Sequence, residues 1–183
     1  MSAEAVLEKS LWSPRASAAR PSSPSAVRTI RIGLLGLGHV GQAVARLAAD
    51  RGATARTGIR FRVEQALVRD LSRPRQCPKP ARLTAQTAAF LRGNYDVVIE
   101  ALEGAEPART LVSRLLGRGT AVVTANKALL AEHGPYLEGI AAERGSAFRF
   151  EATALSAVPF LGTLGSRPFV ASIDRLLAIV NGT

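Results

Sequence analysis

Cysteine is almost absent from this 183-residue sequence, in which Cys77 is the only one. A single cysteine excludes an intrachain disulfide and any metal site built from several cysteines. The flanking residues Gln76 and Pro78 supply no base that could activate the thiol. We interpret Cys77 as an ordinary loop residue and expect a reducing, cytoplasmic location.

Long apolar runs are lacking as well. Runs such as Ala121-Val122-Val123 and Val97-Val98-Ile99 are far shorter than the roughly 20 residues that cross a bilayer, so we expect no membrane partner. Hydrophobic residues nevertheless make up 47% of the chain, which excludes a disordered protein of low hydrophobicity. The length suits one domain with a substantial core.

Acidic residues are few, since 14 Asp and Glu stand against 24 Lys and Arg and leave a net charge of +10. The excess is local, because eleven Lys or Arg and three Asp or Glu between Arg46 and Arg92 supply +8 of it. A basic stretch of this kind can bind nucleic acid. The basic residues are not regularly interleaved with aromatic ones, and no helix-turn-helix pattern accompanies them. We therefore expect no nucleic-acid partner.

Two regions differ in composition. Residues 1–26 are rich in Ser, Pro, Ala and Arg, which predicts a disordered tail. Glu4 and Glu8 argue against an organelle transit peptide, and the tail has no apolar core for a secretory signal. Residues 27–183 are expected to form one domain.

Short apolar runs alternate with stretches of helical period from Val27 onward, which is typical of βαβ units on a parallel sheet. The strands are predicted at Thr29–Leu35, Phe61–Val68, Tyr95–Ala101, Thr120–Thr124, Ala147–Glu151 and Ile173–Val180. A proline-rich loop is expected from Leu71 to Pro80. The helices are predicted at Val40–Gly52, Thr84–Leu91, Pro107–Leu116, Lys127–Ala131 and Pro135–Arg144.

The segment from Gly36 to Gly41 reads G-x-G-x-x-G and lies between the first strand and the first helix. Gly36 permits the tight turn, Gly38 lets the backbone approach a pyrophosphate, and Gly41 lets helix and strand pack closely. The amides that open the helix, at His39 and Val40, are expected to bind phosphate. A glycine-rich turn that merely joins strand to helix is the alternative. The motif predicts a Rossmann-like α/β fold, with a doubly wound, mostly parallel sheet, helices on both faces and a bound nicotinamide dinucleotide.

The end of the second strand bears on the choice between NAD and NADP. An acidic residue there usually binds the ribose hydroxyls of NAD, whereas an arginine can accommodate the 2′-phosphate of NADP. This sequence has Arg69 followed by Asp70, so both cofactors stay open. Arg69 is a candidate for the phosphate contact or for stacking on adenine. Three further basic residues in the next loop are more simply explained as a solvated surface: Arg73, Arg75 and Lys79.

The chain resembles the NAD(P)-binding domain of the homoserine dehydrogenases over nearly the whole length beyond the tail. The resemblance covers Ile32 to Leu47, Val68 to Arg75 and Val97 to Gly104, and it is most specific in the string from Gly119 to Ala131. We count Ala101 and Gly182 with the cofactor-binding residues. The resemblance implies NAD(P)-linked interconversion of aspartate semialdehyde and homoserine, a step of threonine and methionine synthesis.

The string from Gly119 to Ala131 contains the candidate catalytic residue. A loop at the carboxyl end of the fourth strand faces the crevice where a nicotinamide lies, so Thr124, Asn126 and Lys127 can meet cofactor and substrate. The ammonium of Lys127 beside the reacting carbonyl can stabilise an alkoxide or hold substrate and cofactor in register. A lysine at a helix start is otherwise simply exposed to solvent.

A sodium ion is implied by the resemblance, because the loop after the family's fifth strand holds one. The ligands would be Glu151, Ala154, Ser156 and Val158, oxygen donors of the kind a hard cation takes. Leu155, Ser156 and Ala157 stand where the family is glycine-rich, which restricts the conformations open to this loop. Glu151 can alternatively just end the fifth strand.

The sequence ends at Thr183, where the resemblance implies the passage into a substrate domain that also makes most of the dimer. We therefore expect this chain alone to bind cofactor weakly and turn over little or no homoserine, and a homo-oligomer can form if that domain is supplied. A non-catalytic NAD(P)-binding module, or a partner subunit of a split dehydrogenase, is the alternative. Another semialdehyde or dihydrodipicolinate-type reductase is a third hypothesis, which the Thr124 to Ala131 string disfavours.

Overall fold

The computed structural model describes residues 27–78, 80, 82–154 and 162. The expected tail, the strand at Ile173–Val180, and Lys79, Ser156, Val158 and Gly182 lie outside these residues. The sheet and its helices belong to a compact unit from Ala26 to Phe150, whereas Glu151 belongs to a second unit. Within the described ranges, no helix is both long enough and apolar enough to pass through a membrane.

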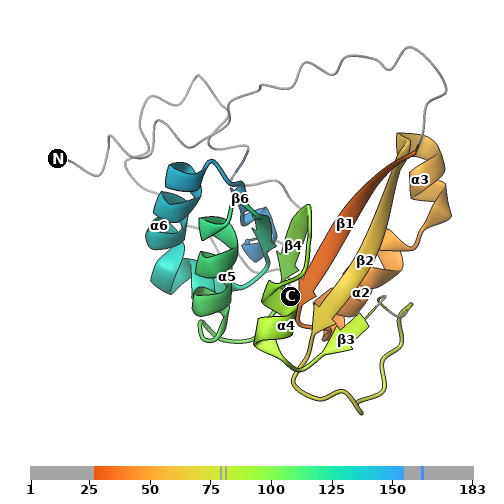
Figure 1. The fold of residues 1–183 in the computed structure, drawn as a ribbon, viewed down its shortest axis with the longest axis horizontal. Coiled ribbons are helices and arrows are strands. Elements are labelled where there is room, and N and C mark those ends of the chain that lie inside the picture. Colours follow the sequence, from red (N-terminus) through yellow and green to blue (C-terminus); the bar gives the residue numbers. More distant parts are fainter. Residues whose placement is uncertain (1–26, 79, 81, 155–161, 163–183) are drawn as a thin grey trace. The chain divides into compact units, whose positions relative to one another are not determined.

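Six parallel strands form one sheet in the order β3-β2-β1-β4-β5-β6 (Figure 1). They are β1 (Arg28–Leu35), β2 (Ile59–Leu67), β3 (Arg82–Thr84), β4 (Val97–Glu100), β5 (Ala121–Thr124) and β6 (Phe148–Arg149). The chain builds outward from β1 to β3, then returns to the other side of β1 and builds outward again. This order confirms the expected doubly wound fold, and the direction reverses between β1 and β4.

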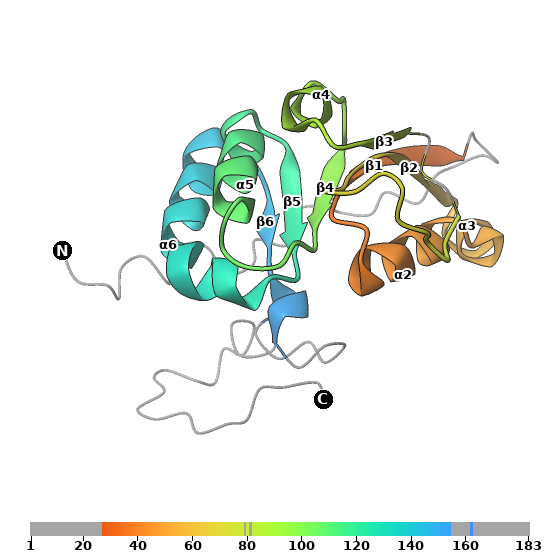
Figure 2. The same ribbon diagram turned by 90° about the horizontal axis from the view of Figure 1, so that it is seen from below.

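Helices cover both faces of the sheet (Figure 2). They are α2 (His39–Ala48), α3 (Arg51–Thr57), α4 (Thr87–Leu91), α5 (Ala108–Gly117) and α6 (Lys127–Arg144). Because side chains alternate along a strand, β1 turns Ile32 and Leu34 toward α2 and Leu35 toward α4, α5 and α6. Each face thus has its own apolar core, which fixes the sheet between two helical layers.

Two predicted boundaries near α2 and β3 were wrong. The first helix ends at Ala48 instead of continuing to Gly52, because Asp50 caps a second helix, α3, by accepting a hydrogen bond from the Gly52 amide at 2.8 Å. Arg82–Thr84, where no strand was predicted, forms the edge strand β3, since its backbone pairs with β2. The next helix begins at Thr87, not at Thr84.

The predicted break before Pro135 was also wrong, because α6 runs unbroken from Lys127 to Arg144 with Pro135 inside it. Leu129 and Leu137 lie on either side of the proline and are both buried in the core beneath α5 and α6. Their burial holds both halves in one line against the cost of the missing backbone hydrogen bond. Glu151, which was expected to end the fifth strand, instead begins a short 3-10 turn, Glu151–Thr153.

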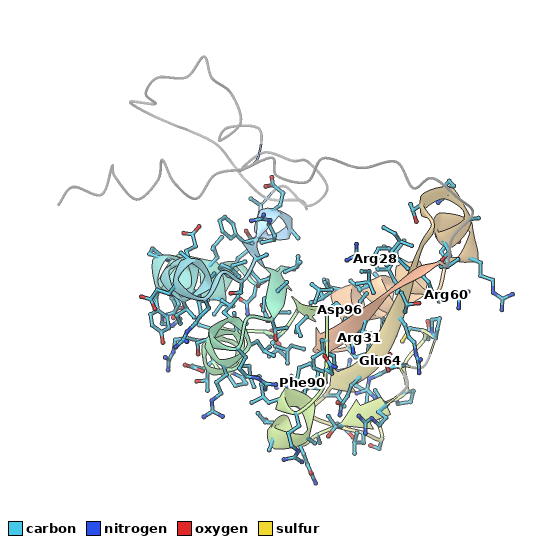
Figure 3. All side chains as sticks on the ribbon, turned by 45° about the horizontal axis from the view of Figure 1, so that its top comes forward. Arg28, Arg31, Arg60, Glu64, Phe90 and Asp96 are labelled. Carbon is cyan, nitrogen blue, oxygen red and sulfur yellow. The ribbon has the colours of Figure 1, made fainter. Side chains whose placement is uncertain are left out.

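An ion pair joins the start of β4 to the middle of β1 (Figure 3). Arg31 Nη2 lies 2.9 Å from Asp96 Oδ1, and Arg31 Nε donates to Oδ2 at 3.1 Å. The backbone amide of Arg31 donates to the same Oδ2 at 2.7 Å. Asp96 therefore holds the two central strands together on the amino side of their shared register.

Candidate functional site

The carboxyl ends of five strands lie in one row. Leu35 of β1 pairs with Leu67 of β2 and with Glu100 of β4, Glu100 pairs with Thr124 of β5, and Leu67 pairs with Thr84 of β3. The loops after these residues therefore start at one level along this edge. In open parallel sheets ligands bind outside this edge, at the point where the strand order reverses.

The three glycines between β1 and α2 have the separate roles that their spacing predicts. Gly36 has φ +95°, and a Cβ there would lie 2.7 Å from the carbonyl oxygen of Ala101, so the turn tolerates no side chain. A Cβ on Gly41 would lie 2.3 Å from the Gly36 carbonyl oxygen, which makes glycine necessary where the helix meets the turn. A Cβ on Gly38 would meet nothing within 4 Å. The loop is thus closed at its two ends and open to a ligand in the middle.

The start of α2 offers bare amides to that open space. Gly38 is the N-cap, and at this helix start, which the structure describes in full, no side chain caps the amides and no acidic residue lies in the first turn. His39 and Val40 are exposed, Val40 to 49%. The free amides and the positive end of the helix dipole together favour an anion such as a diphosphate.

The end of β2 presents Arg69 to solvent, directly after the buried Val68. The next residue, Asp70, turns its carboxylate back onto the loop, where Oδ1 accepts hydrogen bonds from Ser72 N at 2.8 Å and Ser72 Oγ at 2.6 Å. These hydrogen bonds hold the pKa of Asp70 below its ordinary value. Arg75 donates to the carbonyl oxygens of Arg73 and Asp70 at 2.8 and 2.6 Å. Asp70 and Arg75 therefore shape the loop.

Helix α2 also holds this loop in place. Gln42 Oε1 accepts from the backbone amide of Gln76 at 2.7 Å, and Arg46 donates to the Gln76 carbonyl oxygen at 2.9 Å. Beneath the loop lies a hollow of about 240 Å³, lined among others by Leu37 from the glycine turn and Leu83 from β3. Hydrogen bonds thus join α2 to the loop beyond β2.

The far side of the reversal point is built on Glu100, the last residue of β4, whose side chain is fully buried. Its Oε1 accepts from Leu102 N at 2.7 Å and from Asn126 Nδ2 at 3.3 Å, and its Oε2 accepts from the hydroxyl of Thr124. Burial raises the pKa of Glu100, and these three hydrogen bonds oppose that rise. The sequence-based prediction missed Glu100, although an acidic residue ending the apolar run Val97-Val98-Ile99 was a visible signal.

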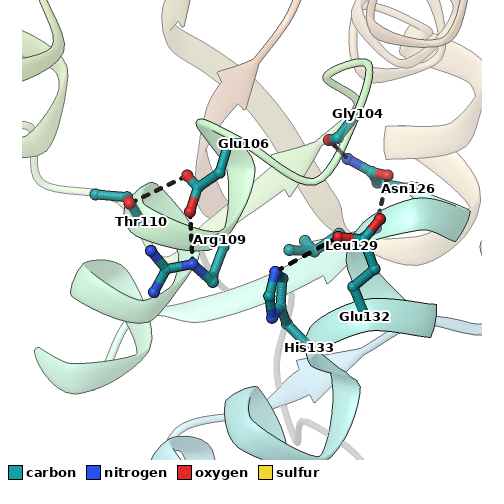
Figure 4. A network of polar contacts seen from close by, with 8 residues as sticks. All are labelled: Gly104, Glu106, Arg109, Thr110, Asn126, Leu129, Glu132 and His133. Atoms are coloured by element: carbon teal, nitrogen blue, oxygen red, sulfur yellow. Dashed lines mark hydrogen bonds and ion pairs between the residues drawn. The ribbon is translucent and has the colours of Figure 1, made fainter.

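Asn126 ties the loop after β4 to the start of α6 (Figure 4). Its Nδ2 donates to the Gly104 carbonyl oxygen at 2.7 Å, and its Oδ1 accepts from Leu129 N at 3.0 Å as the cap of the helix. Lys127, the first residue of α6, is exposed at this edge. The fold thus brings Ala101, Thr124, Asn126 and Lys127 to the edge that carries the glycine turn.

The expected sodium ligands are only partly described. Glu151 and Ala154 lie in the second unit, where Glu151 Oε2 accepts from the Gly162 amide at 2.9 Å. Ser156 and Val158 lie outside the described residues, as does the cofactor candidate Gly182.

A reversal point in a parallel sheet, a turn of three non-interchangeable glycines and an uncapped helix define a nicotinamide-dinucleotide-binding domain of the Rossmann type. A family model described as the NAD binding domain of homoserine dehydrogenase matches residues 36–151. The chain therefore belongs to the homoserine dehydrogenase family.

Three relatives show the extent of the likeness. The homoserine dehydrogenase of Corynebacterium glutamicum is 37% identical over 157 residues, which are 84% of this chain and 35% of that protein. A crystal structure of S. aureus homoserine dehydrogenase has a TM-score of 0.64 at 33% identity and covers 70% of this chain and 34% of its own. A hyperthermophilic archaeal homoserine dehydrogenase in complex with NADPH shares the fold, with a TM-score of 0.55 at 19% identity over 74% of this chain and 48% of its own. The chain spans about a third of the length of the C. glutamicum relative.

Proposed function

We propose that this chain supplies the cofactor-binding part of a homoserine dehydrogenase, which interconverts L-aspartate 4-semialdehyde and L-homoserine with NAD(P). The observation that carries the proposal is the glycine turn at the reversal point, closed at Gly36 and Gly41 and open at Gly38. Family membership supports the reaction and its substrates. A small-molecule substrate and the cofactor are the partners that this reaction requires.

The residues at the carboxyl edge fit a dinucleotide. The amides of His39, Val40 and Gly41 would hold the diphosphate, because they open a helix without a capping side chain. Ala101, Thr124 and Asn126 would border the nicotinamide half, since they lie at the ends of the strands on the other side of the reversal point. When bound, the cofactor supplies or accepts the hydride. Lys127 would place its ammonium at the substrate oxygen, where it stabilises developing negative charge.

NADP is our proposal for the preferred cofactor. Arg69 is exposed at the end of β2, where the ribose of the adenosine half lies in this fold, while Asp70 is held by its own loop. A planar guanidinium suits a phosphate, and a carboxylate already hydrogen-bonded to Ser72 is less available to ribose hydroxyls. The NADPH complex of the archaeal relative supports the same choice.

A sodium ion at Glu151, Ala154, Ser156 and Val158 stays a prediction, because the described part of the chain holds only two of the four residues. No step of the proposed reaction depends on this ion.

The proposal is tested by replacing Gly38 with valine. The backbone at Gly38 is extended and open space surrounds its missing Cβ, so Gly38→Val should fold like the wild type. The added side chain would occupy the space that the diphosphate needs. We expect the dissociation constants of NADPH and NADH, measured by calorimetry on the full chain, to rise about tenfold or more, which is about 1.4 kcal/mol.

Gly139→Val is the matched control, because Gly139 is exposed on α6 and a Cβ there would also meet nothing within 4 Å. This variant should bind both nucleotides like the wild type. Equal binding by Gly38→Val, or no binding by the wild-type chain, would contradict the proposal.

A further inference from the structure

Glu100 is a fully buried carboxylate at the carboxyl edge of the sheet, where the proposed cofactor site lies. A buried carboxylate is costly unless hydrogen bonds compensate it. Its three donors come from three segments: Leu102 from the loop after β4, Thr124 from the end of β5, and Asn126 from the cap of α6. One side chain therefore connects the loop after β4, the end of β5 and the start of α6.

The connection continues through Asn126. The Asn126 amide nitrogen donates to Thr124 Oγ1 at 3.0 Å, so Thr124 bridges Glu100 and the backbone that enters α6. The side chain of Asn126 reaches both Gly104 and the first turn of α6. The position of Lys127, the next residue, depends on where this cap is held.

The segments that Glu100 joins border only one half of the dinucleotide. From the strand order, the ends of β2 and β3 would border the adenosine half, and the ends of β4 and β5 would border the nicotinamide half. Glu100 lies on the nicotinamide side. Its hydrogen bonds hold the Leu102 to Gly104 loop and the Asn126–Lys127 pair in one arrangement.

We infer that Glu100 is a positioning residue for the nicotinamide half of the cofactor, acting through Thr124 and Asn126 on the loops that border the nicotinamide. This inference rests on the proposed function. If the inference is correct, a substitution at Glu100 should weaken binding of the nicotinamide half and leave binding of the adenosine half unchanged.

The test compares NADPH with adenosine 2′,5′-bisphosphate, which lacks the nicotinamide half, on the full chain. Glu100→Gln keeps the shape of the side chain, removes its negative charge and replaces one accepting oxygen with an amide donor, so the contact with Thr124 must reverse its direction or the network must rearrange. We expect its dissociation constant for NADPH to rise about tenfold while that for the bisphosphate stays within about twofold. The nicotinamide fluorescence of bound NADPH should also shift toward that of free NADPH.

Thr124 provides a second pair of variants, which serves even if Glu100→Gln folds poorly. Thr124→Val removes the hydroxyl that donates to Glu100, whereas Thr124→Ser keeps it. The valine variant should bind NADPH more weakly with little change for the bisphosphate, and the serine variant, which keeps the hydroxyl, should lose less NADPH affinity than the valine variant.

Val98→Ala controls for a merely structural effect, because Val98 is buried on the same strand and face as Glu100. It should lower the thermal stability and leave the ratio of the two dissociation constants unchanged. An unchanged ratio in Glu100→Gln and Thr124→Val would overturn the inference while the proposed function stood. A wild-type chain that bound neither ligand would overturn both.

Discussion

Residues that are neighbours in the sequence have different tasks at the end of β2. Arg69 is exposed, Asp70 closes its own loop through Ser72, and Arg75 donates to two carbonyl oxygens of that loop. Charge alone therefore does not single out one candidate for a phosphate contact in a stretch with several arginines. Which hydrogen bonds each side chain already makes decides which one is left for a ligand.

Arg69→Ala tests this division at the level of one side chain. We expect the dissociation constant for NADPH to rise about tenfold, because a charge-assisted contact to the 2′-phosphate is lost, while that for NADH changes less than about twofold. Titrations of both cofactors measure it. Arg114→Ala is the control, since Arg114 is exposed in the last turn of α5 and should alter neither value. Equal losses for NADPH and NADH would contradict the assignment.

Pairs of elements are held together by contacts that lie outside the site, and the pairing of β1 with β4 is the example. Arg31 and Asp96 connect these strands through two side-chain hydrogen bonds and one from the Arg31 backbone amide. The side chains are 38% and 36% exposed, so water screens part of their attraction. The hydrogen bond from Arg31 still lowers the pKa of Asp96 to about 2.

Asp96→Asn should therefore destabilise the protein in a pH-dependent way. A carboxyl whose pKa is lower in the folded state stabilises the fold above its ordinary pKa near 3.8, and this contribution is lost as the pH falls toward 2. We expect the variant to lose about 0.5–1 kcal/mol of unfolding free energy at neutral pH and progressively less below about pH 4. Urea unfolding at several pH values measures the difference. A difference that stayed constant with pH would show that Asp96 acts through something other than its charge.

The unit from Ala26 to Phe150 as a whole is a sheet between two helical layers, and the buried polar residues Glu100, Thr124 and Asn126 lie where β4 and β5 end. Its amino side carries the Arg31–Asp96 pair, and its carboxyl edge carries the glycine turn and the Glu100 network. The ion pair and the proposed cofactor site are thus separate along β1 and β4. Because the two are separate, the binding of variants at the carboxyl edge can be compared while the apolar cores stay intact.

Joining this chain to the remainder of the C. glutamicum relative, in place of the matching third of that protein, tests the activity. We expect the chimera to oxidise homoserine with NADP, and Lys127→Met to lower kcat about 100-fold with the cofactor affinity within about twofold, because the ammonium acts on developing charge. Arg144→Met, at the other end of α6, should match the unmodified chimera. Activity that survived in Lys127→Met would remove this residue from the mechanism.

Local sequence patterns determined the glycine turn and the fold class of this protein. The spacing of Gly36, Gly38 and Gly41 after an apolar run predicted the turn and the helix that follows it. Each glycine is required by local geometry, because the backbone approaches it closely or a ligand must do so. The alternation of strands and helices predicted the doubly wound parallel sheet, since a parallel pair needs a crossover.

Tertiary contacts decided what those patterns left open. Pro135 reads as a helix break, yet Leu129 and Leu137 pack into one core and keep α6 whole. The sequence Arg82–Thr84 does not by itself predict a strand. It forms β3 because its backbone pairs with the free edge of β2. The sequence shows that Glu100 ends an apolar run, but not which groups it binds, because its donors are separated along the chain and meet only in the folded sheet. A residue's local preference is a fraction of a kcal/mol to about 3 kcal/mol, and burial in a shared core can exceed it.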